Sequence, residues 1–259
     1  MSRLPAALVS TFVWIAWGLL VIAWTPAVAL AWALTAWWDQ RRRIAGRLFR
    51  SCARAAVGAN PLWSVRFEGR LPRDRSRPYV VVCNHESLAD PVLVGCLSWE
   101  MKWLSKRSIA RIPFLGWMMW LVGDVPVRRR DPESRSRAYA RLRGWLERGV
   151  PVIIFPEGTR APTAELLPFH DGAFRLALET GTPILPLALS GTRQAIAKGS
   201  LTFGRARAVV RILEPVEVSG DPEDPADVER LREAVRELID RRRKRPPAAR
   251  PARGPSRPA

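Results

Sequence analysis

The chain has 259 residues and a mass of 29.1 kDa, with 47% hydrophobic and 25% charged residues, which suits one good-sized domain with an appendage and argues against disorder. A net charge of +18 calls for an acidic partner, which nucleic acid, an anionic membrane or an acidic carrier protein would each supply. Three cysteines, Cys52, Cys83 and Cys96, lack metal-ligand spacing, so they argue against a disulfide framework and a zinc site and indicate a reducing compartment.

The first segment of the chain is apolar. No charged residue lies between Arg3 and Asp39, which leaves 35 uncharged positions. This is more than twice the apolar core of a signal peptide, and as one straight helix it would measure about 50 Å against a hydrocarbon core of about 30 Å. We therefore predict a membrane anchor over residues 1–40. It is either a hairpin of two helices that breaks at Thr25-Pro26 or a single tilted and kinked helix.

A cluster of arginines follows the anchor, at positions 41, 42, 43, 47, 50 and 54. Such clusters stay on the cytoplasmic side of a membrane and attract anionic headgroups. The sequence therefore predicts that the remaining chain faces the cytoplasm.

Between residues 41 and 240, short β-rich runs alternate with helical stretches, a pattern typical of a mainly parallel sheet covered by helices. The predicted strands are 63–67, 79–83, 102–105, 124–127, 150–155, 184–188 and 208–212, and the predicted helices are 88–97, 134–148, 172–180 and 224–243. The fold class is therefore α/β, with residues 41–240 forming one domain.

Two further segments stand apart from this pattern. Residues 109–122, "IARIPFLGWMMWLV", form either a buried core helix or an apolar surface that contacts the membrane or lines a channel for an acyl chain. Residues 241–259 carry eight basic residues and no acid, and they are rich in proline, which predicts a disordered basic tail. This tail either adds attraction to membrane phosphates or has no measurable effect.

The chain has two histidines, His85 and His170, as candidates for a general base near neutral pH. His85 follows the apolar run "YVVVC" within "NHESLAD", at a strand's carboxyl end, where ligands bind in open α/β sheets. On a single helix, residues five positions apart would lie about 140° apart. We therefore expect Ser87 to be the N-cap, which would leave His85 in a loop and Asp90 in the first helical turn, where carboxylate can meet imidazole. The alternative is a surface histidine beside a helix cap.

Two more segments follow predicted strands. In "FPEGTR" (155–160), glycine permits close approach of the backbone to a ligand, and threonine and arginine can donate hydrogen bonds to phosphate. "GDVPVRRR" (123–130) ends with three arginines. Taken alone, the first could be an ordinary polar turn and the second a set of solvated charges. No serine or cysteine stands in a nucleophile-elbow setting, which favours direct attack by an acceptor hydroxyl over a covalent enzyme intermediate.

The ordered set "NHESLAD", "GDVPVRR", "FPEGTR" and "ILPLAL" resembles the four blocks of the glycerolipid acyltransferase family, the 1-acylglycerol-3-phosphate acyltransferases, over about residues 65–217. The resemblance implies that His85 is the catalytic base and Asp90 its partner. It also assigns substrate binding to Arg129, Glu157, Gly158, Thr159 and Arg160. Pro126 and Arg128 depart from the family's second block, and His170 stands where the family often has a lysine, so it is a further candidate for phosphate binding.

The resemblance implies transfer of a fatty acyl group from acyl-CoA or acyl carrier protein to the sn-2 hydroxyl of 1-acyl-glycerol-3-phosphate, giving phosphatidic acid. It implies no metal and no cofactor beyond the acyl donor, and it implies a bacterial inner (plasma) membrane location with the catalytic domain on the cytoplasmic side. One alternative is another lysolipid acceptor, such as lysophosphatidylglycerol or a lyso-ornithine lipid. A membrane-tethered nucleic-acid-binding protein would need basic residues interleaved with stacking aromatics, whereas the tryptophans here lie mostly in apolar segments.

Overall fold

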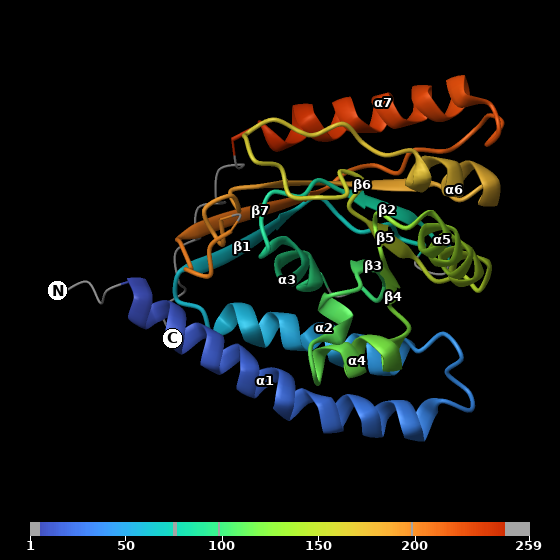
Figure 1. The fold of residues 1–259 in the computed structure, drawn as a ribbon. Helices are drawn as coiled ribbons and strands as arrows, with labels where there is room; N and C mark the ends of the chain where they lie inside the picture. The colour runs from blue at the N-terminus through green and yellow to red at the C-terminus, as the bar shows by residue number, and fades with distance from the viewer. Residues whose placement is uncertain (1–5, 75–76, 98, 198, 247–259) are drawn as a thin grey trace, which may run out of the picture.

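The computed structural model describes residues 6–74, 77–97, 99–197 and 199–246. In this part of the chain a seven-stranded sheet has the order β1-β7-β6-β2-β5-β3-β4 (Figure 1). Only the β6–β7 pair is antiparallel, so the predicted α/β fold with a mainly parallel sheet is confirmed. The strands are β1 (Trp63–Glu68), β2 (Val80–Cys83), β3 (Lys102–Lys106), β4 (Val125–Val127), β5 (Val152–Ile154), β6 (Ile184–Ser190) and β7 (Ala206–Ile212).

The central strands are short apolar runs because both faces of the sheet are covered. On one face, Val80 and Val82 of β2 pack with α5 (Pro132–Glu147), α6 (Gly172–Thr180) and α7 (Pro225–Arg243). On the other, Val81 and Cys83 pack toward α3 (Asp90–Gly95). Figure 1 shows α1, α2 and α4 beyond α3 on this second side. Because β2, β5, β3 and β4 pair in parallel, their carboxyl ends share one edge of the sheet.

The N-terminal apolar segment forms one helix, α1 (Ala6–Thr35), so the predicted break at Thr25-Pro26 is wrong. Proline removes a single backbone N–H donor, and long apolar helices tolerate the loss of that one hydrogen bond. The hydroxyl of Thr25 also donates a hydrogen bond to the Val21 carbonyl at 2.8 Å within the same turn. The single-helix alternative is the one observed.

The chain reverses after α1 and returns along it as α2 (Arg43–Gly58), a helix that we did not predict (Figure 1). Ala45, Phe49, Cys52 and Ala56 form its buried stripe, at the spacing of an amphipathic helix. Arg50 ties α2 to the sheet, because its Nη2 lies 2.5 Å from Oδ1 of Asp124 just before β4. The arginine cluster of the sequence is thus mostly part of a packed helix.

Residues 109–122 are partly buried and partly exposed, so the two predicted alternatives are combined, whereas contact with a membrane or an acyl chain stays a prediction. They form a short 3₁₀ helix, η1 (Ile109–Arg111), and α4 (Leu115–Val122). Met118 and Val122 of α4 are buried, whereas Trp117 and Trp120 are 56% and 68% exposed. One side of α4 therefore belongs to the core and the other remains an apolar surface.

The prediction of a disordered tail is wrong for residues 241–243, because α7 continues through Arg243, whose side chain is buried. Residues 247–259, the rest of the predicted tail, lie outside the described residues.

Candidate active site

His85 and Asp90 meet in the loop between β2 and α3. Nδ1 of His85 lies 2.8 Å from Oδ2 of Asp90, and the same oxygen accepts hydrogen bonds from the backbone N–H of Glu86 at 2.6 Å and of Ser87 at 2.8 Å. Asp90 is fully buried and His85 nearly so. Three donors therefore converge on one carboxylate oxygen and fix the loop around it.

The helix begins at Asp90 with Ala89 at its N-cap, so the predicted N-cap role of Ser87 is wrong. The Ser87 hydroxyl accepts from the N–H of Ala89 at 3.3 Å, donates to the carbonyl of Ile196 at 3.0 Å and accepts from the Ile196 N–H at 3.1 Å. Ser87 thus joins the loop that holds His85 to the segment after β6. The expectation that His85 lies in a loop and Asp90 in the first helical turn is confirmed.

The "FPEGTR" segment interlocks with this loop. Oε1 of Glu157 accepts from the N–H of His85 at 2.6 Å, Oε2 accepts from the N–H of Leu167 at 3.0 Å, and the N–H of Ala161 donates to the His85 carbonyl at 2.9 Å. Burial raises the pKa of Glu157, and these two amide donors oppose the rise. Substrate binding by Glu157 stays a prediction. The contacts observed here are with backbone groups that hold His85 in position.

The pair has the geometry of a general base and its orienting group. An ionised carboxylate only accepts hydrogen bonds, so the Asp90 contact places the proton of a neutral His85 ring on Nδ1. Nε2 is then left without a proton and can accept one from a substrate hydroxyl. The ring also packs on Phe155, with centroids 4.6 Å apart, which limits its rotation.

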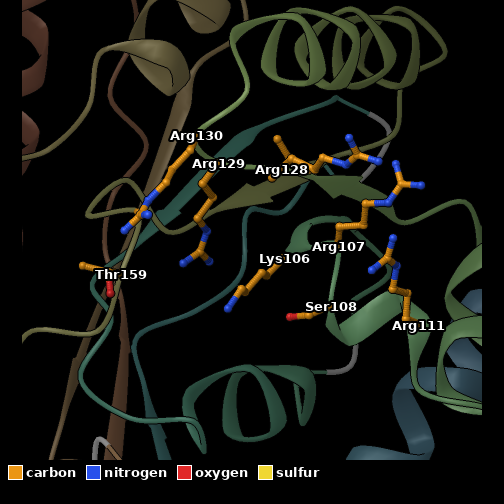
Figure 2. Close-up of a pocket in the computed structure, with 10 residues that line it drawn as sticks. Lys106, Arg107, Ser108, Arg111, Arg128, Arg129, Arg130 and Thr159 are labelled. Atoms are coloured by element: carbon orange, nitrogen blue, oxygen red, sulfur yellow. The ribbon is translucent and has the colours of Figure 1, made fainter.

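A basic pocket of about 590 Å³ lies beside this loop, at the carboxyl ends of β3 and β4 (Figure 2). Val127, Gly158 and the side chains of Ser108 and Thr159 complete its wall, and none of the described residues that line it is acidic. Its basic residues are Lys106, Arg107, Arg111, Arg128, Arg129 and Arg130. Of these, Arg128 also lies 3.8 Å from Oδ2 of Asp131, and a cavity with this lining can bind a highly charged anion such as a phosphate monoester.

Only some of the predicted substrate-binding residues line this pocket. Arg129, Gly158 and Thr159 line it, whereas Arg160 is half-buried and is outside the described lining. No carboxylate among the described residues forms an ion pair with Arg129, and partial burial of its guanidinium lowers its pKa by desolvation. Figure 2 shows the side chains of Arg129 and Lys106 directed into the same space, with Thr159 across from them.

Lys106, Arg107 and Arg111 were not among the predicted site residues. Lys106 ends β3, as His85 follows β2, so the rule that ligands bind at the carboxyl ends of parallel strands would have found it. Arg107 and Arg111 carry no comparable signal, since they lie beyond the strand and in η1.

A second cavity of about 370 Å³ shares Val127, Arg129 and Gly158 with the basic pocket. Its wall is mainly apolar and includes Phe155, which also contacts the His85 ring. His170 lines this cavity and not the basic pocket, so phosphate binding by His170 stays a prediction. Gly158 has φ of +65°, and a Cβ at this position would lie 2.9 Å from the His170 ring, so both conformation and space favour glycine.

Comparisons with known proteins show which family this chain resembles. The family model named Acyltransferase matches residues 64–190. A 1-acyl-sn-glycerol-3-phosphate acyltransferase of Haemophilus influenzae is 30% identical over 189 residues, which cover 70% of this chain and 76% of the relative. A chloroplast enzyme of the same name from Brassica napus is 35% identical over 161 residues, 60% of this chain and 46% of the relative. The chain spans about half the length of the plant and algal relatives that it matches.

The crystal structure of the 1-acyl-sn-glycerophosphate (LPA) acyltransferase PlsC from Thermotoga maritima has the same fold, with a TM-score of 0.74 and 25% identity over 92% of this chain and 96% of that one. The sheet, the His85–Asp90 pair and the basic pocket at one edge of the sheet are features of an α/β enzyme. With these relatives, the chain belongs to the glycerolipid acyltransferase family, as its four sequence blocks predicted.

Proposed function

We propose that the protein transfers a fatty acyl group from acyl-CoA or acyl carrier protein to the sn-2 hydroxyl of 1-acyl-glycerol-3-phosphate, giving phosphatidic acid. The observation that carries this proposal is the His85–Asp90 pair and the basic pocket at the same edge of the sheet. The names of the relatives support it, since they are 1-acyl-sn-glycerol-3-phosphate acyltransferases.

In the proposed reaction, Nε2 of His85 takes the proton of the acceptor hydroxyl as its oxygen attacks the thioester carbonyl carbon. The new C–O bond forms first, and the C–S bond then breaks to release a thiolate. This thiolate, or the water around it, takes up the proton from the imidazolium, which returns His85 to its neutral form. Asp90 stabilises the transient imidazolium. We propose no redox step, because acyl transfer from sulfur to oxygen changes no oxidation state.

The charge of the pocket favours a phosphate monoester among the possible acceptors. A monoester carries nearly two negative charges near neutral pH, whereas the phosphodiester of lysophosphatidylglycerol carries one and a lyso-ornithine lipid has no phosphate. Six basic residues without an acid suit the most highly charged of these headgroups. The same positive surface would attract an acidic acyl carrier protein or the phosphates of acyl-CoA, and the chain's net charge of +18 has the right sign for either donor.

A panel of lysolipids and donors tests the proposed function. The purified full-length protein is assayed in lipid with lysophosphatidic acid, lysophosphatidylglycerol, lysophosphatidylcholine and a lyso-ornithine lipid, each with acyl-CoA and with acyl carrier protein. We expect kcat/KM for lysophosphatidic acid to exceed the others by about tenfold or more, because one charge-assisted hydrogen bond contributes about 1.5–3 kcal/mol. A higher value for another lysolipid would assign that acceptor instead. No acylated product from any pair would overturn the acyltransferase proposal.

We propose that α1 holds the enzyme at the bacterial inner membrane, with the catalytic domain on the cytoplasmic side. It is the one helix in the described part of the chain that is long and apolar enough to cross a membrane. Its large apolar side chains on one side, among them Phe12, Ile15 and Leu19, are about 60% exposed. Trp120 of α4 lies next to Trp32 of α1, with ring centroids 6.0 Å apart, so the exposed face of α4 continues this apolar surface.

Lysines on the exposed face of α1 test the anchor without disturbing its packed face. A charge in the apolar layer costs about 2.5–3.5 kcal/mol, so the double variant Ile15→Lys/Leu19→Lys should lose most of its binding to vesicles in a flotation assay. The matched control Ile15→Ala/Leu19→Ala should still float. Deleting residues 1–38 is a poorer test, because it would also uncover the apolar faces of α2 and α4. Flotation of the double-lysine variant to the wild-type extent would contradict the anchor.

A further inference from the structure

The end of α7 reaches the catalytic loop from 157 residues away in the sequence. Arg243 is the last residue of α7 and is only 8% exposed. Its Nη1 donates to Oε1 of Glu86 at 3.2 Å, and its Nε and Nη2 donate to Oδ1 of Asp240 at 2.9 and 2.7 Å. Glu86 follows His85 directly, and its own N–H donates to Asp90. One guanidinium thus links the C-terminal helix to the loop that carries the catalytic pair.

Both ends of this contact are fixed by their surroundings. Val235 and Ile239 of α7 are fully buried against the sheet. Beyond the helix, Nη2 of Arg211 donates to the carbonyl of Arg245 at 2.8 Å, and Nε of Arg211 lies 2.9 Å from Oε2 of Glu68. The main chain on both sides of Arg243 is therefore attached to the rest of the protein.

Glu86 is buried as well, and its charged neighbours come from several elements. Burial raises the pKa of Glu86, Asp90 adds to the rise, and Arg193 and Arg243 oppose it. Arg193, which follows β6, lies 3.7 Å from the same Oε1 that Arg243 contacts. The charged and titratable groups that interact with Glu86 are Cys83, Asp90, Glu157, Arg193 and Arg243. Without the arginines, the carboxylates of Glu86, Asp90 and Glu157 would lie together at the loop that holds His85.

We propose that Arg243 and Glu86 form a positioning pair for the catalytic base. The pair holds the backbone of the loop in which His85 and Asp90 meet, and it neutralises a carboxylate beside them. Neither residue touches substrate in this scheme, since both act through the loop. The effect on turnover rests on the proposed function, whereas the effect on the His85 ring does not.

The two members of the pair have opposite electrostatic effects on the histidine. Removing the Arg243 guanidinium leaves Arg193 as the one cation at the Glu86 carboxylate among the described residues, and the added net negative charge favours the protonated imidazole. Removing the carboxylate leaves an excess of positive charge, which disfavours the protonated imidazole. Removing both leaves the net charge of the site as it is in the wild type. A purely structural contact predicts no such opposed shifts.

Histidine NMR on the full-length protein in detergent measures this directly, because His85 and His170 are the only histidines and His170→Gln assigns the signals. We expect Arg243→Met to move the titration midpoint of the His85 ring up by about 0.5–1 pH unit and Glu86→Gln to move it down by a similar amount. The double variant should return close to the wild-type midpoint. The acid limb of the activity profile should shift with the ring. Arg242→Met, an exposed neighbour on the same helix, is the matched control and should change neither.

Unshifted His85 midpoints in all three variants, with activity lost equally at every pH, would reduce the pair to a contact that stabilises the fold. If Arg243→Met does not fold, the nearly isosteric Glu86→Gln tests the proposal alone, through the direction in which it moves the His85 titration midpoint. The ring titration needs no turnover. A wild-type protein that acylates no lysolipid would therefore overturn the proposed function and leave this inference to be judged separately.

Discussion

Replacing His85 by alanine is expected to lower kcat for acyl transfer by about 10²- to 10⁴-fold, the usual contribution of a positioned general base. The acceptor hydroxyl has a pKa far above neutrality, so it attacks the thioester slowly unless a base removes its proton in the transition state. Nε2 of His85 is the atom available for that proton, because Nδ1 is held by Asp90 at 2.8 Å. Steady-state kinetics on lysophosphatidic acid, with vesicle flotation as the test of intact membrane binding, measures the effect.

Asp90→Asn is expected to lower kcat severely as well. An amide can stabilise the wrong tautomer of the ring and cannot stabilise the imidazolium that forms. The loop would also change, since three donors converge on Oδ2 of Asp90. Asp224→Asn is the matched control, because Asp224 is likewise an aspartate at a helix start, where it accepts from the N–H of Ala226 far from the site. Near wild-type kcat in purified His85→Ala on any lysolipid would show that this pair is not the catalytic base.

Replacing Arg129 by alanine is expected to raise KM for the lysolipid by about 10- to 100-fold and KM for the acyl donor far less. One charge-assisted hydrogen bond to phosphate contributes about 1.5–3 kcal/mol, and Arg129 lines the basic pocket without an ion-pair partner among the described residues. Lys106→Ala is expected to act in the same direction, because its ammonium points into the same space (Figure 2). Arg129→Lys should recover only part of the loss, since lysine keeps the charge and loses the planar fork.

Replacing Arg160 by alanine tests whether the sequence motif or the observed pocket lining identifies the phosphate-binding residues. The family blocks assign Arg160 to phosphate binding, but it lies outside the described lining of the pocket, so we expect a smaller rise in KM than for Arg129→Ala. Arg141→Ala, an exposed arginine on α5, is the matched control and should leave both KM values unchanged. Equal rises in KM for lysolipid and donor in Arg129→Ala would indicate damage to the fold, and no rise would remove Arg129 from the binding site.

Several parts of this protein were determined by the sequence alone. Apolar runs such as "VVVC" and "VII" are read correctly as central strands, because a strand covered on both faces has no polar alternation. The helix Gly172–Thr180 was predicted to the residue, since a left-handed glycine, Gly181, ends it. His85 and Asp90 were found because their contact is local, within five residues of one loop.

The tertiary structure decided what depends on contacts between distant segments. The order of the strands sets the antiparallel pairing of β7 with β6 and brings Lys106 and Arg129 to one pocket. The path of α7 brings Arg243 to Glu86. A single sequence shows periodicity and local spacing, which predict helices, strands and contacts within short loops. It does not show the distance between residues that are far apart along the chain, because the free energy of packing the whole core sets that distance. The same limit explains Pro26, whose local preference for a break was overridden by the packing of one continuous α1 against α2 and α4.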